Sequence, residues 1–229
     1  DPALTSAGDC LHVPGFCSDH QARDMLSALA RDARLSGLAL GKHRSGQHLV
    51  VYGESLKASP TFTSLVAQLL SAFGVTLVDC WLNLYEGPTA MKPWHSDNYL
   101  DRSPRPTLTL GLSLGGARRM AFRHSSGRIF RLEQGNGDLF AFDERFNQHF
   151  MHSVLPLGSA STGRPVESRI SVIVWAREGP QVKTVVRRKT KGWRDEVPLS
   201  VSWEDWDLST GQDPSQSVAH PEVRCEAAG

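Results

Sequence analysis

Apolar residues recur with a helical period in the first third of the chain. Residues 17–35, CSDHQARDMLSALARDARL, carry Ala, Met and Leu at intervals of three and four, which predicts an amphipathic helix. Ser18 followed by Gln21 forms a capping-box pattern at its start. A second helix is predicted to begin at Ser59, a typical N-cap residue, with Pro60 in its first turn, and to end at Gly74.

Beyond Gly74 the apolar period changes to two. Short strands separated by Gly, Pro and Asn clusters are predicted at about 76–85, 107–114, 119–124, 128–132, 138–142, 149–155 and 169–176. Residues 1–16 show no such pattern and are expected to be irregular. Two helices followed by many short strands indicate an α+β fold in which the N-terminal helices pack on one sheet of a β-sandwich or jelly roll.

The composition is that of a globular protein, since 40% of the 229 residues are hydrophobic and 21% are charged. The formal net charge of +1 gives no overall attraction to a polyanion, so any nucleic-acid contact must come from local patches. The four scattered cysteines form no CxxC pair, which argues against a zinc knuckle and fits a reducing compartment. No apolar run reaches about 18 residues and no signal-peptide pattern opens the chain. We therefore expect an intracellular protein, in the nucleus or cytoplasm, without a membrane span.

The composition changes after about residue 180. Residues 183–194 are basic, residues 195–207 are acidic with two tryptophans, and the remainder is rich in Ser, Gln and Pro. We therefore expect one domain over residues 1–180 and an extension over residues 181–229. The extension is expected to dock partly through its tryptophans and to end in a disordered tail.

The segment KPWHSDN, residues 92–98, places His95 and Asp97 two residues apart. On an extended backbone these side chains point the same way and can reach one metal ion. His-x-Asp is common by chance, so a metal site needs a third ligand. His152 lies in a predicted strand and has the best setting, while its nearest rival, His149, lies on the opposite strand face. Two histidines and one carboxylate are the ligand set of nonhaem iron(II) oxygenases, and a histidine of the core is the alternative for His152.

The predicted last strand, RISVIVWAR, places Arg169 and Ser171 on one face. An arginine on the inner side of a sandwich needs an anion, and its planar fork suits a carboxylate. An arginine at a solvent-exposed strand edge is the alternative. Upstream, WLNLYEG places Asn83 and Tyr85 on one face, again as polar groups in an apolar strand.

The order Asn-x-Tyr, His-x-Asp, distant His and Arg-x-Ser resembles the AlkB family of iron(II)- and 2-oxoglutarate-dependent dioxygenases, over about residues 11–177. LHVPGF, VVYGE and NLYEG are similar to the family's opening, its Tyr-Gly strand and its Asn-x-Tyr motif. GLSLGGARRMAFRH and LEQGNGDLFAFDERFNQHFMHSVLP parallel its hairpin and its distal-histidine strand. The resemblance implies a double-stranded β-helix (jelly-roll) core and dependence on Fe(II), 2-oxoglutarate and O2.

Position by position, the resemblance assigns catalysis and iron binding to His95, Asp97 and His152. It assigns the side-chain carboxylate of 2-oxoglutarate to Arg169, with Tyr85 and Ser171 as hydrogen-bond partners and Asn83 nearby.

The last strand departs from the family pattern Arg-x-Asn-x-Thr-x-Arg. Ser171 stands in place of Asn, and Trp175 stands in place of the second arginine. Arg177 lies on the same predicted strand face, about 6.6 Å farther along. Either Arg177 substitutes after a local shift or that contact is absent.

Two further departures concern the substrate. Repair members of the family have acidic residues after the metal Asp that contact a cationic methylated base, whereas Asn98 and Tyr99 stand here. The loop at residues 53–59 is also short where repair members carry a long lid. Tyr99 is a candidate for stacking on a planar group. Arg118, Arg119 and Arg123 are candidates for contacting phosphates, with a solvated charged face as the alternative.

These features predict an oxygenase that demethylates or hydroxylates a modified nucleobase in DNA or RNA. The expected partner is nucleic acid, no membrane is involved and a monomer is favoured. The alternatives are an oxygenase of the same fold that acts on a protein or small molecule, and a non-catalytic binding module.

Overall fold

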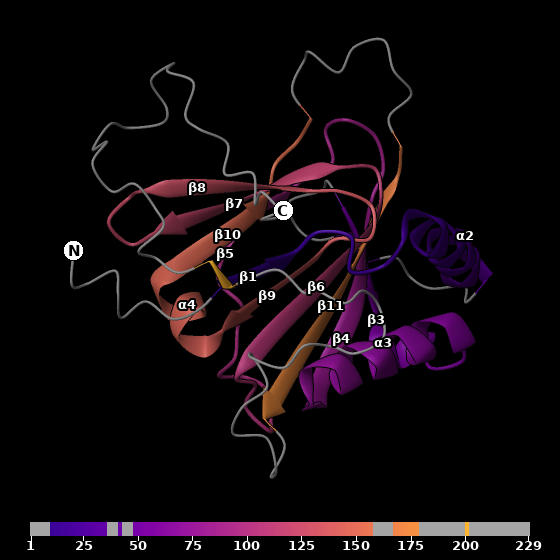
Figure 1. Ribbon diagram of the computed structural model, residues 1–229, viewed down its shortest axis with the longest axis horizontal. Coiled ribbons are helices and arrows are strands. Elements are labelled where there is room, and N and C mark those ends of the chain that lie inside the picture. Colours follow the sequence, from indigo (N-terminus) through magenta and orange to yellow (C-terminus); the bar gives the residue numbers. More distant parts are fainter. Residues whose placement is uncertain (1–9, 36–40, 43–47, 158–166, 179–199, 202–229) are drawn as a thin grey trace.

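Two antiparallel sheets face each other in the computed structural model, which describes residues 10–35, 41–42, 48–157, 167–178 and 200–201 (Figure 1). The larger sheet has the order β12 (Ser200–Val201), β1 (Cys10–Val13), β9 (Leu139–Asp143), β6 (Leu108–Gly115), β11 (Arg169–Glu178), β4 (Val75–Tyr85), β3 (Leu49–Tyr52) and β2 (Gly41–Lys42). The smaller sheet has the order β5 (Lys92–His95), β10 (Phe150–Val154), β7 (Arg118–His124) and β8 (Ile129–Gln134). The predicted α+β jelly-roll architecture is confirmed.

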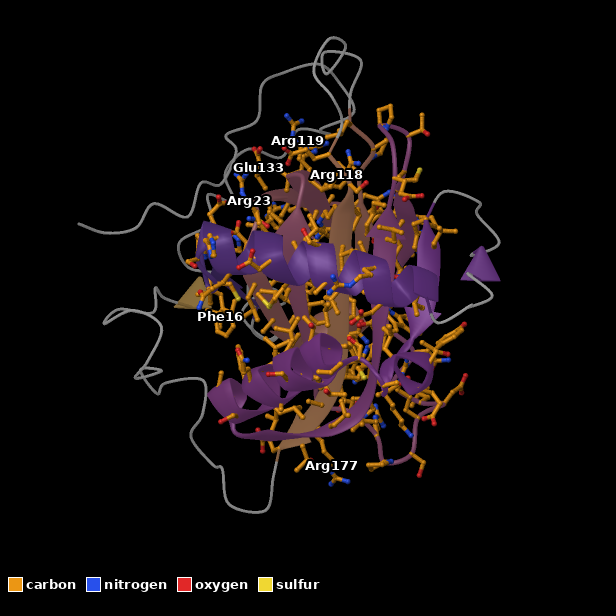
Figure 2. All side chains as sticks on the ribbon, turned by 90° about the vertical axis from the view of Figure 1, so that its right-hand side faces the viewer. Phe16, Arg23, Arg118, Arg119, Glu133 and Arg177 are labelled. Carbon is orange, nitrogen blue, oxygen red and sulfur yellow. The ribbon has the colours of Figure 1, made fainter. Side chains whose placement is uncertain are left out.

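Both predicted helices are present, and they cover the outer face of the larger sheet (Figures 1 and 2). They are α2 (Asp19–Leu35) and α3 (Pro60–Phe73), and a 3₁₀ helix, η1 (Gly53–Leu56), precedes α3. The Ser59 hydroxyl caps α3 by accepting from the Phe62 N–H at 3.1 Å, and it donates to Asp32 of α2 at 2.6 Å. Gly74 ends α3 in the left-handed conformation, with φ 61°. Ser59 therefore both caps the start of α3 and links α3 to α2.

Strand alternation divides the interior into two layers. On β11, Ile170, Val172 and Val174 face the helices and belong to the main apolar core. Ile173 and Trp175 face the smaller sheet and belong to a second cluster with several phenylalanines. The predicted alternation of this strand is thus confirmed, and the face that carries Arg169 lies between the sheets.

Three segments differ from the sequence prediction. Residues 10–13 form β1, which pairs with β9, and are not irregular. The predicted strand 149–155 begins one residue later, because residues 144–149 form a short helix, α4 (Glu144–His149). The Asp143 side chain caps this helix by accepting from the Phe146 N–H at 2.7 Å.

Most of the predicted extension lies outside the described residues, including its tryptophans and its basic segment. Its described part, β12, pairs with β1 at the edge of the larger sheet. None of the helices in the described ranges combines the length and apolarity needed to span a membrane.

Replacement of Ser59 by alanine is expected to lower the free energy of unfolding by about 1–2 kcal/mol, because α3 loses its N-cap and Asp32 loses a hydrogen-bond donor. Urea denaturation of Ser59→Ala measures this loss. Ser64→Ala, an exposed change within the same helix, is the control and should leave stability within about 0.5 kcal/mol of wild type. Equal stability of the two variants would show that the cap contributes nothing.

Candidate active site

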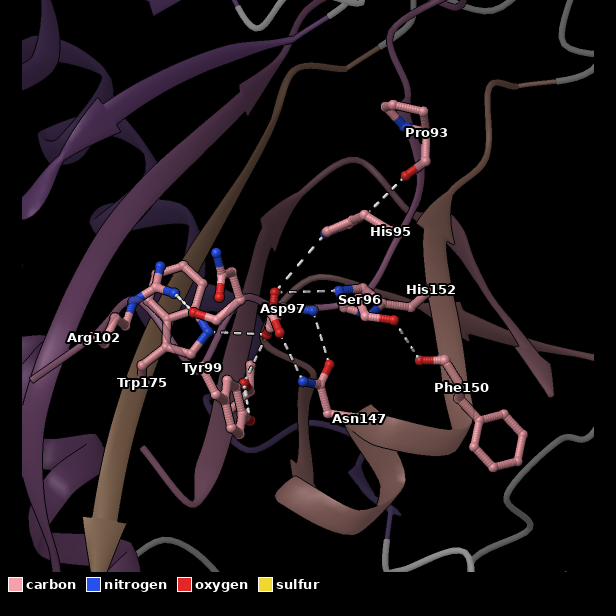
Figure 3. Close-up of polar contacts among 12 residues, drawn as sticks. Pro93, His95, Ser96, Asp97, Tyr99, Arg102, Asn147, Phe150, His152 and Trp175 are labelled. Atoms are coloured by element: carbon pink, nitrogen blue, oxygen red, sulfur yellow. Dashed lines mark hydrogen bonds and ion pairs between the residues drawn. The ribbon is translucent and has the colours of Figure 1, made fainter. Parts of the chain in front are cut away.

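Three side chains from the smaller sheet converge between the two sheets. His95 ends β5, Asp97 follows it, and His152 lies opposite His95 on the neighbouring strand β10. The Oδ1 atom of Asp97 is 3.9 Å from His95 Nε2 and 3.7 Å from His152 Nε2 (Figure 3). The ligand atoms of all three residues lie within 4.8 Å of one another. Two bonds of about 2.1 Å to one ion span about 4.2 Å, so small side-chain rotations suffice for a shared ion.

Hydrogen bonds hold one oxygen of Asp97 and leave the other directed at the imidazoles. Its Oδ2 accepts from the Trp175 indole N–H at 2.9 Å and from the Thr109 hydroxyl at 2.7 Å. Because Thr109 gives its single hydroxyl proton to Asp97, Thr109 accepts from the Tyr99 hydroxyl, 2.6 Å away. The carboxylate is therefore fixed in an orientation that leaves Oδ1 for a metal.

The backbone of Asp97 is held as well. The side chain of Asn147, on α4, accepts from the Asp97 N–H and donates to the Asp97 carbonyl, both at 2.8 Å. The Ser96 hydroxyl donates to the Phe150 carbonyl at 3.3 Å. The short helix that the sequence pattern did not predict therefore positions the loop that carries the carboxylate (Figure 3).

The hydrogen bond of His95 and the burial of His152 suit both imidazoles to bind a metal. The Nδ1 atom of His95 lies 2.8 Å from the Pro93 carbonyl, which can only accept, so the proton is on Nδ1. Burial lowers the pKa of His152 to about 4, which keeps its ring neutral at physiological pH. Two neutral imidazoles and one carboxylate form a donor set suited to a divalent transition metal.

Trp175 is itself held in a stack of aromatic and cationic groups. Its ring centroid lies 4.2 Å from that of Trp81, at an angle of 82°. The guanidinium carbon of Arg102 lies 4.0 Å from the Trp175 ring centroid. Arg102 also donates from Nε to Asp79 at 3.1 Å, which fixes the guanidinium in place. The indole that donates to Asp97 is thus held by Trp81 and Arg102 together, and Figure 3 shows Arg102 beside it.

A pocket lies beside the three converging residues, in the space between the sheets, and Asp97 and His152 form part of its wall. Besides Asp97 and His152, its polar lining comes from Asn83, Tyr85, Lys92, Gln134, Arg169 and Ser171. Met120, Phe140, Val154 and Ile173 supply apolar walls.

Arg169 is a buried cation whose hydrogen-bond partners are neutral. It is 1% exposed and donates to Ser113 at 2.8 Å and to Gln134 at 2.7 Å. Its Nη1 has no partner, and its guanidinium lies 5.2 Å from the ring centroid of Tyr85. A buried charge with an unused donor is costly, so this end of the pocket is suited to an anion.

Comparison with known proteins identifies the family. Residues 14–174 match the 2OG-Fe(II) oxygenase superfamily. The chain belongs to this superfamily. It is therefore an Fe(II)- and 2-oxoglutarate-dependent dioxygenase, whose cofactors are Fe(II), 2-oxoglutarate and O2. A search of curated protein sequences found no significant match.

Two solved structures illustrate the fold of this oxygenase. A prolyl-4-hydroxylase from Pseudomonas putida superposes with a TM-score of 0.56 at 16% identity, covering 78% of this chain and 100% of that chain. SnoK is a non-heme alpha-ketoglutarate-dependent carbocyclase from nogalamycin biosynthesis. It superposes with a TM-score of 0.54 at 14% identity, covering 82% of this chain and 89% of SnoK. At these identities the likeness shows the fold.

The residues of the oxygenase fit the groups that its family requires. His95, Asp97 and His152 would hold the iron with two neutral nitrogens and the unengaged oxygen of Asp97. The unused donor of Arg169 would hold the distal carboxylate of 2-oxoglutarate, with Tyr85, Asn83 and Ser171 lining the same pocket.

Arg177 does not reach this pocket. A bulge in the pairing of β11 with β4 falls between Trp175 and Ala176, and Arg177 beyond it is exposed. Figure 2 shows Arg177 at the end of the larger sheet opposite to Arg118. The missing second arginine is therefore not replaced by Arg177, and Trp175 makes the contact to Asp97 instead.

Two other predicted substrate residues are buried away from solvent. Tyr99 is 3% exposed and donates to Thr109, so its ring is part of the core and is not available to stack on a substrate. Arg118 is 1% exposed and donates to the Gly87 carbonyl at 2.9 Å. Neither residue forms a surface that a nucleic acid contacts.

Arg119 and Arg123 lie on β7, on the strand face opposite to Phe122. Phe122 pairs with His152 and belongs to the inner cluster, so strand alternation directs Arg119 and Arg123 to the outer face of the smaller sheet. Arg123 lies over the Trp94 ring, 4.9 Å from its centroid. These two arginines therefore face away from the pocket.

The sequence pattern missed several functional residues. Trp175 and Thr109 hold Asp97, Asn147 holds its backbone, and Lys92 lines the pocket. Trp175 carried a signal, because it is a polar-tipped side chain on the inner face of a strand at a position where the family has an arginine. The others are recognised only when the strands are placed side by side.

Replacement of Trp175 by phenylalanine removes the indole donor and keeps an aromatic ring, so the affinity for Mn(II), used as a redox-stable substitute for Fe(II), is expected to fall about tenfold. Calorimetric titration of the apoprotein measures this change. Trp94→Phe, a change on the outer face of the smaller sheet, is the matched control and should bind Mn(II) as wild type does. An unchanged affinity of Trp175→Phe would show that the indole does not position Asp97.

Replacement of Arg169 by alanine is expected to raise the 2-oxoglutarate concentration needed for half-maximal succinate formation by about tenfold or more, because a charge-assisted hydrogen bond is lost. Mn(II) affinity should be retained, since Arg169 makes no contact with the three converging residues. A requirement equal to that of wild type would place the carboxylate anchor elsewhere.

Proposed function

We propose that this oxygenase hydroxylates or oxidatively demethylates a neutral modified nucleobase in DNA or RNA. The observation that carries the proposal is the aromatic surface between the pocket and solvent. Trp81 contacts the pocket residue Lys92 on one side and Tyr52 on the other, with ring centroids of Trp81 and Tyr52 5.9 Å apart. Tyr52 is 58% exposed. Planar rings that lead from the surface to the metal residues suit a flat, unsaturated substrate.

The electrostatics of this entrance favour a neutral base over a cationic one. Arg102 lies over both Trp81 and Trp175, and Lys92 lies over Trp81, so two cations border the aromatic surface. Asp97 is the carboxylate of the pocket lining, and its Oδ2 already accepts two hydrogen bonds. A cationic methylated base would therefore meet positive charges without a free carboxylate partner.

The loop that follows Asp97 also favours a neutral base over a cationic one. The side-chain oxygen of Asn98 accepts from the backbone N–H groups of Leu100 and Asp101, so Asn98 closes a local turn. Asn98 also donates to the Asp101 carboxylate. The positions that carry acidic residues in repair members of the AlkB family therefore stabilise the loop in this chain.

In this superfamily the bound iron, 2-oxoglutarate and O2 together supply the oxidation of a substrate C–H bond, with release of succinate and CO2. The chain's own residues position these groups. His95, Asp97 and His152 provide three ligands on one side of the metal, and Arg169 fixes the far end of the keto acid. Phe140, Val154 and the other apolar walls keep water from the reacting atoms.

The proposal includes nucleic acid as the partner and a location in the nucleus or cytoplasm. The AlkB-like set of Asn83, Tyr85, Asp97, His152 and Arg169 in one pocket supports it, with His95 beside Asp97 and His152. Cys17 and Cys80 are buried free thiols, which suits a reducing compartment.

A screen of modified DNA and RNA oligonucleotides by mass spectrometry tests the proposal. With iron and 2-oxoglutarate, wild type is expected to remove a methylene mass or add one oxygen to an oligonucleotide that carries a neutral modified base. His95→Ala should show no change, because the metal loses a ligand. His149→Ala, a histidine at the end of α4 outside the pocket, is the matched control and should remain active.

Two outcomes of this screen would contradict the proposal. Turnover of oligonucleotides with cationic bases alone would overturn the choice of a neutral base. Succinate release that depends on His95 without any modification of an oligonucleotide would direct the search to protein or small-molecule substrates of the same fold.

A further inference from the structure

Lys92 is a second cation in the pocket, and the AlkB pattern gives it no role. It opens β5, is 8% exposed and lines the pocket together with Asp97 and His152. The pairing of β5 with β10 contains a bulge, since Lys92 is opposite Val154 and His95 is opposite His152. Three steps along β5 thus match two steps along β10, and the bulge places both Lys92 and His95 on the pocket side.

The two cations lie at opposite ends of the pocket. The ammonium of Lys92 lies over Trp81, and the guanidinium of Arg169 lies over Tyr85. These two aromatic residues are four positions apart on β4, which corresponds to about 13 Å along a strand. Trp81 contacts Trp175, the donor to Asp97, so Lys92 is near the metal residues and Arg169 is at the far end. This arrangement matches a dianion with one carboxylate at each end.

Lys92 has no carboxylate partner at ion-pair distance within the described part of the chain. Its ammonium lies 5.1 Å from the ring centroid of Trp81, and burial lowers its pKa. Asp97 cannot serve as a dedicated partner, because Oδ2 accepts from Trp175 and Thr109 and Oδ1 faces the imidazoles. A buried ammonium held mainly over an aromatic face is suited to receive an anion.

We propose that Lys92 binds the carboxylate of 2-oxoglutarate that is adjacent to the ketone. Trp175 occupies the position of the family's second arginine and uses its N–H on Asp97, so Lys92 supplies the positive charge at the metal end. This inference rests on the cosubstrate of the superfamily, and it is independent of the identity of the substrate.

Keto acids with and without the distal carboxylate separate the two cations. Mn(II)-loaded protein is titrated calorimetrically with 2-oxoglutarate and with 2-oxopentanoate, in which a methyl group replaces the distal carboxylate. Lys92→Met is expected to weaken both ligands about tenfold or more, because both retain the carboxylate next to the ketone. Arg169→Gln is expected to weaken 2-oxoglutarate alone. Lys57→Met, an exposed lysine, is the matched control and should bind both ligands as wild type does.

Each remaining outcome has a defined meaning. Unchanged affinity of Lys92→Met for both keto acids overturns the proposal and leaves Lys92 as packing for Trp81. A loss for 2-oxoglutarate alone also overturns it, because Lys92 would then contact the distal carboxylate. A loss for both ligands in Arg169→Gln contradicts the role of Arg169 and leaves the result for Lys92 standing.

Two further variants guard against a folding defect. Lys92→Arg keeps the charge and is expected to retain most of the affinity for both ligands, whereas Lys92→Gln is expected to lose it. If Lys92→Met does not fold, the difference in keto-acid affinity between Lys92→Arg and Lys92→Gln tests the proposal. Thermal melting and Mn(II) affinity, measured beside the titrations, separate loss of ligand binding from loss of structure or of metal. Equal affinities of the Arg and Gln variants would overturn the proposal.

Discussion

The orientation of one carboxylate, that of Asp97, is the constraint on which the site depends. A carboxylate has two equivalent oxygens and rotates easily, so a metal site needs one oxygen to be occupied elsewhere. In this chain Trp175 and Thr109 occupy Oδ2, and Tyr99 in turn donates to Thr109. Hydrogen bonds to a charged group contribute about 1.5–3 kcal/mol each, which is enough to hold a single rotamer. The two oxygens of Asp97 therefore have different roles: Oδ2 accepts hydrogen bonds, and Oδ1 faces the imidazoles.

The sandwich architecture explains how charged groups survive in its interior. The face between the sheets is apolar over the cluster around Phe142 and Phe146, and it becomes polar where β4, β11 and β10 line the pocket. Arg169 and Lys92 stand at the two ends of this polar strip, where Arg169 donates to neutral side chains and Lys92 lies over the ring of Trp81. Such a pocket is costly when unliganded and complementary to a dicarboxylate, so affinity for the cosubstrate is built into the core of the fold.

Much of the fold and of the site could be predicted from local patterns. The period of β11 correctly placed Arg169 and Ser171 between the sheets, and Ser59 and Gly74 marked the ends of α3. The convergence of His95, Asp97 and His152 was also predicted, but that prediction needed the resemblance to the AlkB family in addition to strand alternation. The other predictions needed only the alternation of strands and the preferences of helix ends.

The remaining features depend on contacts between distant segments. Tyr99 and Arg118 were candidates for substrate contact, yet both are buried, and they donate to Thr109 and to the Gly87 carbonyl inside the protein. Arg177 was expected to lie on the same face as Arg169, and the bulge after Trp175 breaks that register. α4 was not predicted because a six-residue helix is too short to show a helical stripe of apolar residues. Bulges and buried hydrogen bonds of this kind do not alter the pattern of apolar and polar residues, so the sequence pattern does not reveal them.

The bulge between β5 and β10 has a consequence for how this site can vary. Residues three apart on a regular strand point to opposite faces, so Lys92 and His95 share a face only because of the extra residue between them. Deletion of that residue would restore plain alternation and send one of the two outward. The ammonium of Lys92 and the imidazole of His95 therefore share one strand face only while the extra residue is present. A related protein without that residue would need a positive charge from another strand.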